Sequence, residues 1–232
     1  SDFGQKAAFR PYGYTNFYVD CAPFLRAGDN ELRVIARNAD QPNSRWYSGA
    51  GIYRPVQLWT ARGAHIALNG VKIRTLSLDP AVVEVCVKIT APGTVRLMVD
   101  DLPTVQQESD GEAVFTLTLD NARLWTPETP NLYTCRVSFA DDVVTETFGV
   151  RKVEWGTDGF LLNGKRYIIQ GACIHHDNGL LGAVCDPDAV ARKVRLLKEN
   201  GYNAIRSAHN PCSKALLAEC DRQGMLVMDE YI

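Results

Sequence analysis

Hydrophobic and polar residues alternate over residues 1–60 with the period of two that is typical of half-buried β-strands. The alternation is imperfect in NFYVDCAPFL (16–25) and NELRVIARN (30–38), and the RAGDN stretch between them has the Gly, Asp and Asn chemistry of a turn. GIYRPVQLW (51–59) predicts a third strand, which Pro55 places at a sheet edge or a bulge. Three strands are too few to close a β-sandwich on their own.

The alternation continues at short spacing between residues 62 and 151, where turn residues such as Pro, Gly and Asp separate the segments. The pattern predicts strands at 65–79, 81–90, 93–101, 112–120, 131–140 and 143–150. Roughly 90 residues with about seven short strands are typical of an immunoglobulin-like sandwich. The Cys-Trp-Cys spacing of antibody domains is absent, so the pattern predicts the architecture alone.

The pattern changes after residue 152. GFLLNGKRY predicts a hairpin with Asn163-Gly164 as its turn, and YIIQGAC (167–173) is nearly all apolar, as in a sheet buried on both faces. Strands and helices then alternate, which predicts parallel strands with right-handed crossovers in a Rossmann-type sheet or a (β/α)₈ barrel. No Gly-x-Gly-x-x-Gly follows a strand, which argues against dinucleotide binding. The predicted elements are helices at 186–201 and 213–224 and strands at 202–206 and 225–230.

The sequence of the first predicted helix indicates where the helix begins and ends and which face is buried. Asp186 or Asp188 can cap its start and Gly201 can end it. An apolar stripe one helical turn apart predicts the face that packs on the sheet, formed by Val190, Val194 and Leu197 with Leu196 nearby.

Composition narrows the class of protein. With 46% hydrophobic residues among 232 the chain can build a packed core, and its net charge of −2 includes no basic stripe for nucleic acid. No apolar run approaches the roughly 20 residues of a membrane helix, and residues 1–10 lack the apolar core of a signal peptide. The seven cysteines include no C-x-x-C pair, which predicts mostly buried free thiols and a reducing compartment.

Candidate chemistry collects where the predicted parallel strands end. In α/β sheets and barrels the functional site lies at the carboxyl ends of the strands, so side chains far apart in sequence converge there. The three strands deliver His175, His176 and Asp177, then Arg206, His209 and Asn210, and finally Asp229 and Glu230.

Each of these residues also has a structural explanation. Arg206 can be an ion-pair partner at a strand end, and His209 can cap the next helix. Neighbouring residues on an extended segment point to opposite sides. Only one residue of each neighbouring pair can therefore face the site, and we favour His175 over His176 and Glu230 over Asp229. A helix-capping or ion-pair role for Asp229 and Glu230 is the alternative.

Two further alternatives concern metal binding and sugar stacking. His175, His176, Asp177 and His209 supply enough ligands for a metal ion, but the alternation of side chains disfavours that set, so no metal site is expected. The aromatic residues Trp46, Tyr47 and Tyr53 can stack on a sugar ring, although core packing is the commoner use of such side chains.

The stretch NAIRSAHNPCSKALLAECDRQGMLVM (203–228) resembles the signature of glycoside hydrolase family 2, the group of β-galactosidases, β-glucuronidases and β-mannosidases. SRWYSGAGIYRPVQLW (44–59) resembles the end of that family's sugar-binding domain. FGVRKVEWGTDGFLLNGKRYIIQGACIHHD (148–177) resembles its junction between sandwich and barrel. The resemblance implies a multidomain β and α/β protein. Residues 1–61 would be the C-terminal part of a jelly roll, 62–151 an immunoglobulin-like β-sandwich, and 152–232 the first three β/α units of a TIM (β/α)₈ barrel.

The resemblance implies a fragment of a retaining exo-β-glycosidase that acts on terminal β-linked sugars, with β-galactosidase favoured. The alternatives are a β-glucuronidase of the same family, or a non-catalytic carbohydrate-binding or structural sandwich module. The acid/base and nucleophile glutamates of the family would lie beyond Ile232, so the fragment itself is expected to be inactive.

Site roles are carried over only where the sequence matches the family pattern. Arg206 would support the nucleophile, and the substrate-binding residues would be His175, His209, Asn210 and Glu230. Asn210 stands where the family often has tyrosine, and ACIHHD departs from the Asn and Arg that often precede the first histidine. Both departures bear on sugar preference.

The expected partner is a β-linked oligosaccharide or glycoside, with no nucleic acid and no membrane. No cofactor is expected in the fragment, while the resemblance leaves open a divalent cation in the full-length enzyme. Three parallel strands cannot close a barrel, so an exposed strand edge is expected to favour a homo-oligomer. The compartment stays open between bacterial cytoplasm and periplasm.

Overall fold

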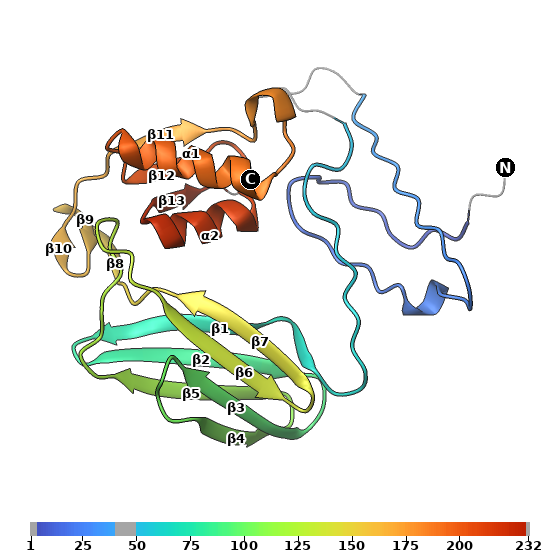
Figure 1. Cartoon of the computed structure of the whole chain (residues 1–232), viewed down its shortest axis with the longest axis horizontal. Helices are drawn as coiled ribbons and strands as arrows, with labels where there is room; N and C mark the ends of the chain where they lie inside the picture. The colour runs from blue at the N-terminus through green and yellow to red at the C-terminus, as the bar shows by residue number, and fades with distance from the viewer. Residues whose placement is uncertain (1–3, 40–49, 231–232) are drawn as a thin grey trace.

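The computed structural model describes residues 4–39 and 50–230 and arranges them in three parts (Figure 1). A long N-terminal segment carries one short 3₁₀ turn, η1 (Ala22–Phe24). A β-sandwich follows, and then a small α/β unit that stands beside both other parts.

The sandwich consists of two antiparallel sheets of three and four strands. One sheet has the order β1 (Ile66–Leu78), β2 (Ala81–Ile89) and β5 (Glu112–Leu119). The other has the order β4 (Val105–Ser109), β3 (Gly93–Val99), β6 (Tyr133–Phe139) and β7 (Asp142–Phe148). The predicted immunoglobulin-like sandwich is confirmed. Within the sandwich, the one strand that the sequence pattern missed is β4, whose polar sequence VQQES lies at a sheet edge and shows no alternation.

Alternating residues of the two sheets form the sandwich core. Every second residue of β2 is buried, beginning at Ala81, and β6 buries Tyr133, Cys135, Val137 and Phe139 in the same way. Each fully buried Val or Phe side chain contributes about 1.5–3 kcal/mol relative to an exposed one. The period of two in the sequence is therefore the physical cause of the two-layer packing.

A three-stranded antiparallel sheet links the sandwich to the α/β unit, in the order β10 (Lys165–Arg166), β9 (Gly159–Leu162) and β8 (Val153–Gly156). Asn163 and Gly164 join β9 to β10, and both have positive φ angles, 53° and 75°. Asn and Gly tolerate this left-handed backbone best, which explains why the predicted hairpin forms at these residues.

The α/β unit is built from three parallel strands in sequence order with one crossover helix between each pair. Its elements are β11 (Gly171–Ile174), the 3₁₀ turn η2 (Gly179–Leu181), α1 (Pro187–Glu199), β12 (Ala204–Ser207), α2 (Lys214–Gln223) and β13 (Leu226–Asp229). Asp186 caps α1 by accepting a hydrogen bond from the Ala189 N–H at 2.9 Å. The sheet is open, and it matches the predicted start of a barrel.

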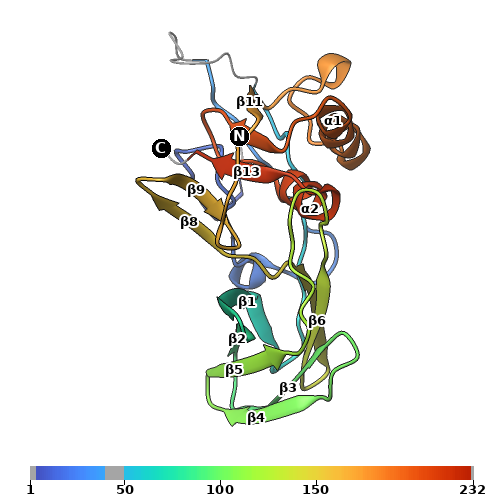
Figure 2. The same ribbon diagram turned by 90° about the vertical axis from the view of Figure 1, so that its left-hand side faces the viewer.

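Both helices cover the same face of the parallel sheet. Val190 and Val194 of α1 and Leu216 of α2 pack with Ile205 of β12 in one buried cluster. The opposite face of β12 has no helix over it among the described residues (Figure 2). The candidate chemistry therefore has one face of the sheet available to it.

Two predicted strand regions differ from the structure. The described residues of the N-terminal segment form no hydrogen-bonded strand at 16–25, 30–38 or 51–59. Alternation creates a strand only where another backbone pairs with it, and here the segment runs without such a partner, with Leu58 81% exposed. The strand predicted from Tyr167 begins only at Gly171. It is an edge strand, and Ile168 just before it is 72% exposed rather than buried.

The cysteines are all free thiols, as predicted, but fewer of them are buried than expected. Cys135, Cys212 and Cys220 are buried, Cys173 is exposed, and the others lie between these extremes. Burial raises the pKa of Cys135 to about 11 and that of Cys212 to about 12, so both thiols stay protonated and unreactive at neutral pH.

The sandwich contacts the α/β unit through the loop between β5 and β6, which reaches α2 (Figure 2). Trp125 in this loop is 1% exposed, and its indole N–H donates to the Asp221 carbonyl oxygen at 2.8 Å. The guanidinium of Arg151 lies 4.8 Å from the indole ring centre. A Cβ atom at Gly149 would come within 2.6 Å of the Trp125 Cβ, so only glycine fits there.

Replacing Trp125 by alanine should lower the free energy of unfolding by about 3–5 kcal/mol, because it empties a packed site and leaves a carbonyl unpaired. The measurement is urea unfolding followed by circular dichroism. Trp155→Ala is the matched control, because that indole is 73% exposed, and it should change stability by about 0.5 kcal/mol or less. Equal stability of the two variants would contradict the anchoring role of Trp125.

Candidate active site

The site lies at the carboxyl edge of the three parallel strands, and strand register decides which side chains meet there. Arg206 pairs in register with Cys173 of β11 and with Met228 of β13, so these three side chains share one face. Ile205 packs under the helices, which places Arg206 on the opposite, uncovered face. Glu230 lies two residues beyond Met228 and therefore returns to the face of Arg206.

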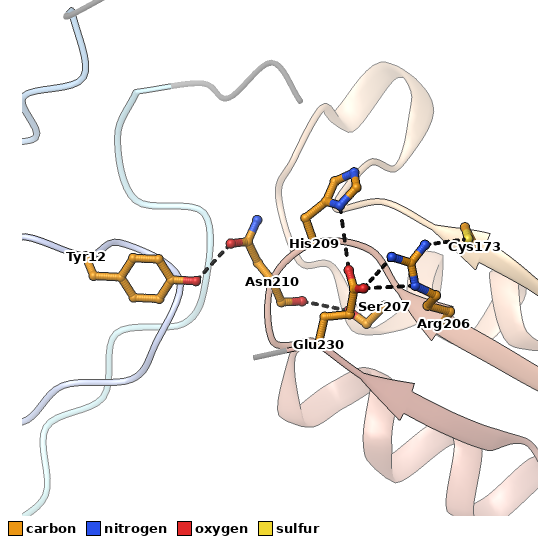
Figure 3. A network of polar contacts seen from close by, with 7 residues as sticks. All are labelled: Tyr12, Cys173, Arg206, Ser207, His209, Asn210 and Glu230. Atoms are coloured by element: carbon orange, nitrogen blue, oxygen red, sulfur yellow. Dashed lines mark hydrogen bonds and ion pairs between the residues drawn. The ribbon is translucent and has the colours of Figure 1, made fainter. Parts of the chain in front are cut away.

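Arg206 and Glu230 form the centre of the site (Figure 3). The Arg206 Nε donates to Glu230 Oε1 at 2.9 Å, and its Nη2 donates to the same oxygen. Its Nη1 contacts the Cys173 sulfur at 3.1 Å. The hydrogen bonds to Cys173 and Glu230 raise the pKa of Arg206, so the guanidinium stays charged. Both side chains remain partly exposed and accessible from solvent.

Two histidines stand next to this ion pair. His209 Nδ1 lies 3.6 Å from the second carboxylate oxygen of Glu230, an ion-pair distance rather than a hydrogen bond. The rings of His209 and His175 are 5.3 Å apart between centres and inclined by 54°. The peptide bond between Ala208 and His209 is cis. The structure thus brings together four of the five predicted site residues: Arg206, His175, His209 and Glu230.

Asn210, the fifth predicted residue, directly follows His209 but turns its amide oxygen toward the N-terminal segment. The Tyr12 hydroxyl donates to Asn210 Oδ1 at 2.8 Å, and the Ser207 hydroxyl donates to the Asn210 carbonyl oxygen at 2.8 Å. Asp229 faces away from Arg206, and its carboxylate accepts a hydrogen bond from the Cys212 N–H at 2.9 Å. Asp229 therefore serves the loop, while Glu230 serves the site.

His176 lines a small, partly open cavity together with His175, Tyr53 and Arg54. Its ring centre lies 5.8 Å from that of Tyr14 and 6.5 Å from that of Tyr53. Its Nε2 is buried and has no hydrogen-bond partner among the described residues. Burial, and then the charge of Arg54, lower the pKa of His176. The cavity has a free volume of about 40 Å³, enough for a few water molecules but not for a sugar ring.

The aromatic residues predicted to stack on a sugar have different outcomes. Tyr53 packs near Tyr14 and His176, and its hydroxyl donates to the Gly13 carbonyl oxygen at 3.3 Å, so it serves packing. Trp46 and Tyr47 lie outside the described residues.

Three residues that contact the site or its loop were not predicted from the sequence: Cys173 on β11, and Tyr12 and Arg54 of the N-terminal segment. Cys173 was discoverable, because it precedes His175 by two positions on a strand and so shares its face. Arg54 belongs to GIYRPVQLW (51–59), a stretch that the sequence analysis predicted as a strand without giving Arg54 a role. Tyr12 carried no signal, because its contact with Asn210 spans 198 positions of sequence.

The residues considered for a metal ion do not assemble. Within residues 4–39 and 50–230, no group of three His, Cys, Asp or Glu side chains is placed to hold one. Asp177 instead lies 3.5 Å from the Lys193 ammonium. Among the same residues, no helix has the length and apolar character needed to cross a membrane.

Comparison with known proteins agrees with this architecture. The family model "Glycosyl hydrolases family 2" matches residues 65–151, and the model "Glycosyl hydrolases family 2, TIM barrel domain" matches residues 153–231. Beta-galactosidase BoGH2A of Bacteroides ovatus is 38% identical over 98% of this chain and 30% of its own length. A putative beta-glucuronidase of Formosa agariphila is 33% identical over 98% of this chain and 24% of its own length.

A solved glycosyl hydrolase family 2 member from Bacteroides cellulosilyticus has a similar structure, with a TM-score of 0.81 and 33% identity over 94% of this chain and 34% of that one. The chain combines a β-sandwich with the opening strands of a TIM barrel, and an Arg–Glu–His cluster lies at the strand ends. The chain belongs to glycoside hydrolase family 2, which confirms the resemblance seen in its sequence. It spans about a third or less of the length of these relatives.

The lowered pKa of His176 predicts acid sensitivity. Burial makes protonation of this imidazole less favourable in the folded state, so below its ordinary pKa of 6.5 the unfolded state binds more protons. The free energy of unfolding therefore falls as the pH is lowered. The urea concentration at the midpoint of unfolding should therefore decrease for the wild type as the pH is lowered from about 7.5 to about 5. It should decrease less for His176→Gln. His65→Gln, in the sandwich, is the control variant. An equally steep decrease in His176→Gln would exclude this histidine as a cause.

Proposed function

We propose that this chain is part of a retaining exo-β-glycosidase that removes terminal β-linked sugars, with β-galactosides preferred. The observation that carries the proposal is the cluster of Arg206, His209 and Glu230 at the carboxyl edge of the parallel strands. These residues sit within or next to the stretch that resembles the family signature. The preference for galactosides rests on the 38% identity to a beta-galactosidase of Bacteroides ovatus.

The chemistry of this class explains what each side chain would do. Retaining hydrolysis uses an acid/base and a nucleophile, two carboxylates about 5 Å apart. A guanidinium presents planar donors that fix the orientation of a carboxylate, which suits Arg206 to holding the nucleophile in place. His175 and His209 would hydrogen-bond sugar hydroxyls, and these bonds would strengthen as the ring distorts toward the transition state. Glu230 would hold Arg206 and His209 in position and contribute to substrate binding.

The 232-residue chain alone is proposed to be inactive. The site cluster contains one carboxylate, Glu230, and Arg206 already holds it. Asp229, the neighbouring carboxylate, is committed to the Cys212 N–H. The described residues supply no cluster of metal ligands, so we assign no step of the reaction to a cation. Activity of the complete enzyme with and without a chelator would test whether it needs one.

The test compares hydrolysis of 4-nitrophenyl β-galactoside by the complete protein that contains this chain and by the chain alone. We expect turnover with retained anomeric configuration from the complete protein and none from the chain. An inverted product would contradict the retaining mechanism. Inactivity of the complete protein combined with sugar binding would instead favour a non-catalytic carbohydrate-binding module.

A β-glucuronidase is the second candidate, because relatives named as putative beta-glucuronidases are also similar over nearly the whole chain. The same assay with 4-nitrophenyl β-glucuronide separates the two. A larger kcat/KM for the glucuronide than for the galactoside would overturn the preferred substrate while leaving the reaction class intact.

Arg206→Lys should lower kcat/KM of the complete protein by about 10- to 100-fold, because lysine keeps the charge but lacks the planar pair of donors with which a guanidinium fixes the orientation of a carboxylate. Arg222→Lys on α2 is the matched control. Arg222 also donates two hydrogen bonds to a carboxylate, that of Glu219, and this pair is exposed on α2. Steady-state kinetics of both variants provide the comparison, and equal losses would argue against a specific role for Arg206.

A further inference from the structure

Two side chains of the N-terminal segment reach across to the loop that carries His209 and Asn210. The Tyr12 hydroxyl donates to Asn210 Oδ1 at 2.8 Å, as Figure 3 shows. Arg54 donates through Nη2 to the Pro211 carbonyl oxygen and through Nη1 to the Tyr14 carbonyl oxygen, the latter at 2.9 Å. The segment therefore grips the loop at two consecutive residues.

The hydrogen bond from Tyr12 fixes which way the side-chain amide of Asn210 is turned. An asparagine amide has one acceptor side and one donor side, and turning it over exchanges them. Because Oδ1 receives the Tyr12 hydroxyl proton, Nδ2 points away from Tyr12, as Figure 3 shows. The backbone of the same residue is fixed as well, since the Ser207 hydroxyl donates to the Asn210 carbonyl oxygen. Asn210 is thus held with its donor side free of Tyr12.

Arg54 supplies an independent restraint on the same loop. One guanidinium joins a carbonyl oxygen of the N-terminal segment to a carbonyl oxygen of the loop, and it lies 5.0 Å from the Tyr53 ring centre. At the loop's other end, Asp229 accepts the Cys212 N–H. Residues 210–212 are therefore each held by a polar contact from outside the loop.

We propose that Tyr12 is a positioning residue that determines sugar specificity by orienting Asn210, so that Asn210 Nδ2 donates a hydrogen bond to an oxygen of the bound sugar. This inference rests on the proposed glycosidase function and deepens it. The substrate group recognised is a hydrogen-bond acceptor, a hydroxyl or carboxylate oxygen, on the sugar ring that lies against His209. Tyr12 itself does not touch the sugar.

The first test is Tyr12→Phe in the complete protein, which removes one hydroxyl and keeps the ring. We expect kcat/KM to fall about 3- to 10-fold, the effect of losing one hydrogen bond. The loss should include a higher KM, whereas a smaller folded fraction would lower kcat alone. Tyr18→Phe is the control. The hydroxyl of Tyr18, in the same segment, accepts a 2.7 Å hydrogen bond from Asn69, outside the candidate site, and its loss should leave both constants unchanged.

A double-mutant cycle then asks whether Tyr12 acts through Asn210. In an Asn210→Ala background, Tyr12→Phe should have no further effect on kcat/KM. The same 3- to 10-fold loss in both backgrounds would overturn the proposal. Asn210→Asp keeps the acceptor for Tyr12 but has no amide donor, so it should lose about as much as Asn210→Ala. Wild-type kinetics for Asn210→Asp would likewise overturn it.

Hydrogen exchange of the chain separates failure of this inference from failure of the proposed function. If the complete protein hydrolyses no glycoside, the proposed function fails, and exchange alone decides the positioning role. Faster exchange at residues 207–213 in Tyr12→Phe, with Tyr18→Phe unchanged there, supports the contact as a restraint. Equal exchange in the wild type and Tyr12→Phe overturns it.

Discussion

The alternation of side chains along β12 and β13 is the constraint on which the site depends. On each strand, neighbouring residues face opposite sides, so Ile205 enters the packing under the helices while Arg206 faces the uncovered side. The same parity places Glu230 beside Arg206 and sends Asp229 to the Cys212 N–H. A shift of one residue in register would exchange these roles and leave a guanidinium under the helices, where an unpaired charge is costly. Packing and chemistry therefore specify the same register.

Most of the fold follows from short-range patterns in the sequence. The period of two predicts the sandwich strands, and Asn163-Gly164 predicts the hairpin, because these signals reflect local backbone and packing preferences. Capping residues and apolar stripes likewise predict the helices of the α/β unit. The strands predicted in the N-terminal segment were wrong, because an alternating sequence shows which face of a strand is apolar but not whether another backbone is close enough to pair with it.

The site was predictable to the extent that it is carried by strand ends. Arg206, His175, His209 and Glu230 were identified because parallel strands bring their carboxyl ends to one edge. The sequence showed that only one of Asp229 and Glu230 can face the site, and the strand register then shows that Glu230 lies beside Arg206. Tyr12 and Arg54 lie far from the barrel strands in sequence, and contacts of that kind have no periodic signature.

Arg54 illustrates a different way of joining parts of a protein. It binds two main-chain oxygens, those of Tyr14 and Pro211, so the connection is indifferent to the side chains at both positions. The connection depends on Arg54 itself and on the backbone path at residues 14 and 211. The neighbouring contact between Tyr12 and Asn210 is of the opposite kind, because it is lost when either side chain changes.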